Sequence, residues 1–127
     1  MNNQYIETLA WKMQNREATT GGERSLACAY LRSVRDGFKV ITVSDVLWEK
    51  DVESFVAALH IAGVSEIYIT TQASNMLGVY LMLDDLGLKL RGVVRLENPA
   101  YARDIERWGH THEETTIPAM WLSFSER

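Results

Sequence analysis

The sequence has one cysteine, Cys28, so no disulfide can form within the chain. Small secreted domains commonly depend on disulfides, and this absence argues against that class. The longest apolar run, Met76–Leu83, is far shorter than the roughly 20 residues of a membrane-spanning helix. The first residues also lack a basic start followed by an apolar stretch, which is the pattern of a secretory signal. We therefore expect a soluble, cytoplasmic protein.

Gly-rich phosphate loops are absent too: neither G-x-G-x-x-G nor G-x-x-x-x-G-K-[ST] occurs. Hypotheses that involve a dinucleotide or a P-loop nucleotide lose their best support, and we expect no cofactor. Basic residues are in the minority, with thirteen Lys and Arg against seventeen Asp and Glu. General binding to nucleic acid relies on cations that neutralise phosphates, so nucleic acid is not an expected partner.

The 127 residues, 46% of them hydrophobic, suffice for one domain with a real core and are too few for two. We expect a single α/β domain over residues 1–127. It divides into a helical pair at 1–36, a βαβαβ unit at 38–96, and a loop with a C-terminal strand at 97–127.

Residues 40–71 organise this domain. Two segments rich in β-branched residues, Val40–Val43 and Glu66–Thr71, flank a helical segment at Asp51–Ala62. Gly63 follows that helix, where a residue that tolerates positive φ is favoured. The helix carries one apolar stripe at i, i+3, i+4 and i+7, made of Val52, Phe55, Val56 and Leu59. This pattern predicts a βαβ unit with two parallel neighbouring strands.

Two helices are expected before this unit. The first spans Asn3–Glu17, and the second runs from a capping box at Thr20 and Glu23 to about Arg35. Because a short turn joins them, we predict an antiparallel pair that covers one face of the sheet.

After the unit, Gln72–Leu86 reads as a third helix, apolar nearly all the way round. Such a helix is either sandwiched between elements or presents a face to a partner. Lys89–Leu96 and Pro118–Phe124 are expected to pair as a wide hairpin. The prediction is a three-layer sandwich around a mixed sheet of about four strands, three parallel and the last an antiparallel edge.

Ligands of open parallel sheets bind beyond the carboxyl ends of the strands. The residues at these ends are polar, and the second loop opens a helix whose free N–H groups suit an anion. The candidate ligand-binding residues are Ser44, Asp45, Thr70, Thr71, Gln72 and Ser74. The same residue types also serve as helix caps, which is the simpler interpretation. No catalytic residue is identified.

Trp48 precedes the helix in a polar segment, where it either seals the end of the sheet or contacts a ligand. His110 and His112 stand beside two glutamates, as some zinc ligands do. Neither a cysteine nor a further histidine lies at a confirming spacing. We therefore expect a solvated loop and no metal site.

The segments Tyr30–Ser33 and Ile41–Val52 resemble a family of small bacterial proteins known only as a domain of unknown function. The resemblance extends through Ala62–Val64, Ile69–Thr71 and Leu86-Gly87, and leaves out the first twenty residues and Arg103–Thr116. It implies a bacterial, cytoplasmic accessory protein of gut Gram-positive species and their mobile elements, and it brings no catalytic residues.

Two functions remain open from the sequence. One is a non-enzymatic binding or regulatory module that acts through protein–protein contact or self-association. The other is a small-ligand-binding or enzymatic domain that uses the carboxyl ends of the parallel strands.

Overall fold

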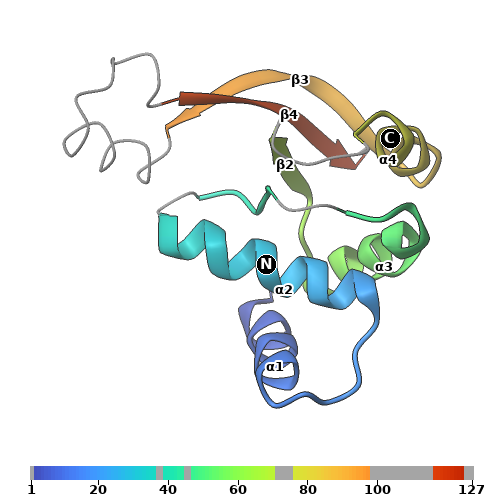
Figure 1. Ribbon diagram of the computed structural model, residues 1–127. Coiled ribbons are helices and arrows are strands. Elements are labelled where there is room, and N and C mark those ends of the chain that lie inside the picture. Colours follow the sequence, from blue (N-terminus) through green and yellow to red (C-terminus); the bar gives the residue numbers. More distant parts are fainter. Residues whose placement is uncertain (1, 37–38, 45–46, 71–75, 98–115, 125–127) are drawn as a thin grey trace.

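The computed structural model describes residues 2–36, 39–44, 47–70, 76–97 and 116–124 (Figure 1). Helices and strands alternate through the middle of the chain, and two helices precede them. In chain order the elements are α1 (Asn3–Gln14), α2 (Gly21–Asp36), β1 (Thr42–Val43), the 3-10 turn η1 (Glu49–Asp51), α3 (Val52–Ala62), β2 (Glu66–Thr70), α4 (Met76–Asp85), β3 (Leu88–Glu97) and β4 (Thr116–Phe124).

The predicted βαβ unit is confirmed. β1 and β2 are neighbours and run parallel, with Thr42 opposite Tyr68 and Val43 opposite Ile69. The whole apolar stripe of α3 is buried. Gly63 ends that helix with φ of 69°, in the left-handed region where glycine carries no steric penalty.

The predicted strand arrangement is wrong in part. The sheet has four strands and is mixed, as expected, but its order is β1-β2-β4-β3. β4 pairs antiparallel with both β2 and β3, so β1–β2 is the one parallel pairing among the described strands. The last strand therefore lies inside the sheet, and β3 forms the edge.

Burial explains why β4 is the inner strand. Ala119 and Leu122 lie on opposite faces of β4, and both are almost fully buried. β4 carries no charged residue, whereas β3 includes Lys89, Arg91 and Arg95. An apolar strand buried on both faces suits the interior of a sheet, and a charged strand suits its edge.

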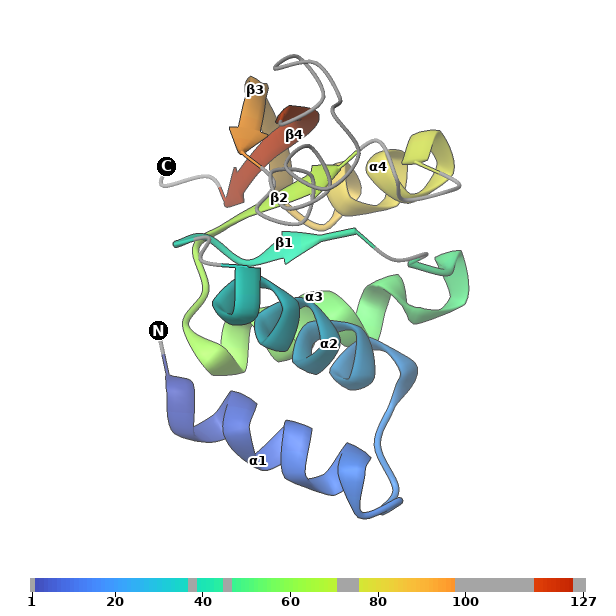
Figure 2. The ribbon, with the colours of Figure 1, turned by 60° about the vertical axis from the view of Figure 1, so that its left-hand side comes forward.

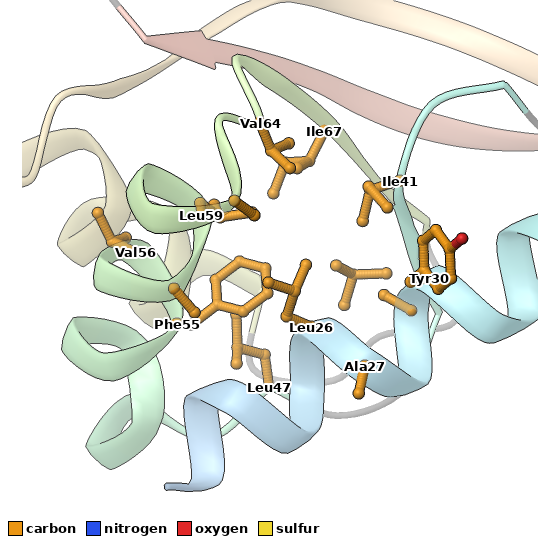
Figure 3. Packing of buried hydrophobic residues seen from close by; sticks show 14 of the residues in the cluster. Leu26, Ala27, Tyr30, Ile41, Leu47, Phe55, Val56, Leu59, Val64 and Ile67 are labelled. Atoms are coloured by element: carbon orange, nitrogen blue, oxygen red, sulfur yellow. The ribbon is translucent and has the colours of Figure 1, made fainter. Parts of the chain in front are cut away.

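One hydrophobic core joins the sheet to the helices. Buried residues of α2, α3 and α4 all belong to it, and α3 contacts both α2 and α4. Figure 3 shows Leu26 of α2 beside Phe55 of α3, with Ile41 and Ile67 on the side of the sheet. The described helices that contact the sheet thus lie on one face. They do not flank it on both sides, as a doubly covered sandwich would require.

The N-terminal helices also differ from the expected pair. α1 contacts α2 and α3, and lies on the side of these helices away from the sheet (Figure 2). Figure 1 looks almost along α1 and across α2, so their axes cross steeply and are not antiparallel. Ile6, Leu9 and Ala10 are the buried residues of α1. The layers are therefore α1, then α2 to α4, then the sheet.

The two edges of the sheet differ. At the β1 edge, the buried N–H of Thr42 donates to Ser33 Oγ of α2 at 2.8 Å, and that hydroxyl donates to the Ala29 carbonyl at 2.6 Å. At the other edge, β3 pairs with β4 alone among the described strands.

Candidate functional site

A pocket of about 240 Å³ opens at the carboxyl end of β1. α2 forms one wall, and the end of β1 with the segment leading into α3 forms the other. The pocket is lined by Gly21, Arg24, Ser25, Cys28, Ala29, Arg32, Val43, Ser44, Trp48 and Asp51. Its position is the one expected for ligands of parallel strands.

One face of α2 supplies the basic wall. Arg24, Cys28 and Arg32 follow each other at intervals of four residues, which places them on the same side of the helix. Both arginines are exposed to solvent, and the cysteine between them is half-buried. The Cys28 thiol also contacts Met13 of α1, with 3.6 Å between the sulfur atoms. Two guanidinium groups therefore lie along one pocket wall.

The start of α2 is fixed by the predicted capping box, which is confirmed. The Glu23 carboxylate accepts a hydrogen bond from the N–H of Thr20 at 2.8 Å, and the Thr20 hydroxyl accepts one from the N–H of Glu23 at 3.1 Å. Because this box sets where the helix begins, it also sets which side chains of α2 reach the pocket.

The beginnings of α2 and α3 meet at the pocket's other end. The N–H of Gly22 donates to Ser54 Oγ at 2.9 Å, and Ser54 donates to the Asp51 carbonyl at 3.1 Å. A Cβ at Gly21 would overlap the Asp51 carboxylate, which therefore lies directly against the start of α2. This acid complements the helix dipole at the start of α2.

Trp48 also lines the pocket. Its side chain is 54% exposed, too open for a residue that only seals the core. An exposed indole in the lining of a pocket offers a flat apolar surface.

The predicted site residues separate in the structure. Ser44 lines the pocket. Thr70, at the end of the neighbouring β2, is completely buried and is not among the lining residues. Four other candidates, Asp45, Thr71, Gln72 and Ser74, lie outside the described residues, as do His110 and His112. Ligand binding by these residues stays a prediction.

Arg24 and Arg32 were missed because α2 was interpreted only as a cover for the sheet. The available signal was their eight-residue spacing on a helix that immediately precedes the first strand. Within the described ranges, no group of three or more His, Cys, Asp or Glu is arranged to hold a metal ion.

The fold and pocket together define a small mixed α/β domain with a partly basic surface site. The family model for a domain of unknown function, DUF7698, matches residues 25–124, and the chain belongs to that family. The match includes Arg103–Thr116, which the sequence resemblance had left out. Searches of curated proteins and of solved structures found no match. None of the described helices has the length and apolar character needed to cross a membrane.

Proposed function

We propose that this protein is a non-enzymatic binding protein that holds a small anionic ligand in the pocket at the end of β1. The observation that carries the proposal is the pairing of Arg24 and Arg32 on one wall with the exposed indole of Trp48. Guanidinium groups bind carboxylates and phosphates in a planar, two-point geometry.

The dimensions of the pocket narrow the ligand class. A volume of about 240 Å³ is below the roughly 300–1,000 Å³ of pockets for drug-sized ligands. The Asp51 carboxylate repels a second negative charge at the α2 start. A ligand with one phosphate or carboxylate group and a short planar or apolar part fits these constraints.

Cys28 provides a direct assay. It is the only cysteine in the sequence and it lines the pocket. A bound ligand should therefore slow its alkylation by iodoacetamide, a neutral reagent. Inorganic phosphate, glycerol 3-phosphate, benzoate and citrate form a suitable panel, with thermal unfolding measured in parallel. At about 100 times its Kd, a ligand adds roughly 2.7 kcal/mol to the free energy of unfolding.

The variants Arg24→Gln and Trp48→Ala should lose both effects. Arg16→Gln removes the same charge from an exposed position that does not line the pocket, so it should retain them. A panel without any protection of Cys28, or equal losses in Arg16→Gln and Arg24→Gln, would contradict the proposal.

A second candidate function is contact with a protein partner or self-association. It is supported by α4, where Leu77 and Leu81 lie one turn apart and are 73% and 55% exposed. Val79 and Leu83, on the other side of the helix, are buried. Light scattering over a range of concentrations tests self-association. A monomer at all concentrations for both the natural chain and Leu77→Glu would exclude that form of the hypothesis.

The resemblance noted in the sequence adds a proposed setting for either function. We infer a bacterial, cytoplasmic accessory protein, encoded by gut Gram-positive species or their mobile elements. Fractionation of a bacterial host that expresses the chain tests the location, and recovery in the membrane fraction would argue against it.

A further inference from the structure

Among the described strands, β3 forms the longer of the two edges of the sheet. β3 spans ten residues and pairs with β4 alone among the described strands. Along an edge strand, every second N–H and C=O points away from the sheet without a partner strand. In Figure 1, β3 arches along the top of the sheet, on the side opposite α2 and α3.

This edge is basic. Lys89 Nζ lies 3.3 Å from Asp84 Oδ2 of α4 and also donates to the Asp84 carbonyl at 2.9 Å. Arg91 Nε donates to Ser123 Oγ at 2.7 Å on the adjacent β4, while Arg95 is exposed. The intramolecular ion pair offsets the charge at the start of the strand, and Arg91 and Arg95 leave its middle basic before the strand ends at Glu97.

The cations occur on both faces of the strand. The register has a bulge between Leu90 and Gly92, after which Val93 lies opposite Met120 and Arg95 opposite Pro118. Val93 and Arg95 thus share the face of the sheet on which the helices lie. Arg91 reaches Ser123, which pairs with Lys89 on the other face. Val93 is 71% exposed and supplies an apolar contact beside Arg95 on that face.

We propose that the β3 edge binds an extended acidic segment of another protein as an added strand. Backbone hydrogen bonds to the open edge would supply affinity, and acidic side chains opposite Arg91 and Arg95 would supply selectivity. This inference does not depend on the ligand pocket, which lies at the opposite end of the strand order.

Charge selects such a partner over a second copy of this chain. β3 carries three basic residues and one acidic residue, so two copies paired along this edge would bring two predominantly basic strands together. An acidic strand would instead place opposite charges along the same edge.

The test uses a fluorescently labelled peptide with the sequence Glu-Glu-Val-Val repeated twice. This order places acids on both faces of an extended strand. We expect saturable binding by fluorescence polarisation, and perturbed amide signals in β3 by NMR. The double variant Arg91→Glu and Arg95→Glu should weaken binding by about tenfold or more, because two attractive pairs become repulsive.

Three controls keep the result specific. The double variant Lys12→Glu and Arg16→Glu makes the same change in net charge near the end of α1 and should change the Kd less than about twofold. A peptide with lysine in place of glutamate should not bind. A proline in the middle of the acidic peptide should also abolish binding, since it removes a strand N–H.

Several results would overturn the proposal. They are equal binding of the lysine peptide, equal loss in the two double variants, and amide changes confined to α2 and α4. Concentration-dependent dimerisation through β3 without peptide binding would identify a second copy as the occupant. Displacement of the peptide by a single-stranded DNA oligonucleotide, with tighter binding of the DNA, would identify nucleic acid.

Discussion

The two edges of the sheet are built in different ways. The β1 edge is two residues long, and a buried serine of α2 accepts the hydrogen bond of its Thr42 N–H. The β3 edge is ten residues long, has no described strand beyond it, and carries exposed Val93 with three basic residues. The comparison indicates that the βαβ side of the fold is the stable scaffold, and that the hairpin side offers a surface.

The largest difference in stability between the two sides should come from adding a methyl group at a glycine. At Gly22, a Cβ would overlap the backbone of Ser54 and Phe55, because α2 and α3 approach each other closely there. We expect Gly22→Ala to lower the free energy of unfolding by about 3 kcal/mol or more. Urea denaturation followed by circular dichroism measures this loss.

Gly92 on β3 is the matched position. The nearest atom to a Cβ there is Trp121 Cε3 at 3.8 Å, an ordinary contact. Gly92→Ala should change stability by less than about 1 kcal/mol. If Gly92→Ala destabilises as much as Gly22→Ala, the β3 side is as tightly constrained as the β1 side, and the comparison fails.

Removing one serine hydroxyl on each side should have a smaller effect on the free energy of unfolding. Ser33→Ala leaves the buried N–H of Thr42 without its acceptor, and such a loss costs about 1–3 kcal/mol. Ser123→Ala removes the acceptor of Arg91, an exposed side chain that water can solvate instead. We expect less than about 0.5 kcal/mol for this variant by the same denaturation assay. Equal losses of stability in the two variants would mean that the Ser33 hydroxyl does not specifically stabilise the β1 edge.

The smallest expected effect is a change in stability with pH. Burial and, next, the hydrogen bond to Glu7 raise the pKa of Tyr30. The unfolded chain ionises this phenol at pH about 10, so the contribution of Tyr30 is complete below that pH and is lost as pH rises through the folded pKa. Stability should fall as pH rises above about 10, and less steeply in Tyr30→Phe. Identical slopes for the two chains would show that this tyrosine is not responsible.

The sequence was sufficient for features that depend on local patterns. The stripe of α3, its glycine stop and the Thr20–Glu23 capping box each follow from a spacing of a few residues. The parallel pairing of β1 with β2 followed as well, because a crossover of this length leaves few alternatives.

Strand order and the steep crossing of α1 over α2 depend on long-range packing, which has no local periodicity. The inner position of β4 still left a signal in the composition, since β4 has no charged residue and β3 has three basic ones. The pocket combines residues from α2 with the end of β1, and it depends on the packing of α2 against both β1 and α3. Of the predicted residues, Ser44 lies in it because it directly follows β1.

Amide hydrogen exchange measured residue by residue is the most direct test of the difference between the edges. We expect slow exchange at Thr42, and alternating slow and fast exchange along Leu88–Glu97, since only every second N–H of an edge strand bonds to its neighbour. Uniform protection along β3, or rapid exchange at Thr42, would contradict this expectation.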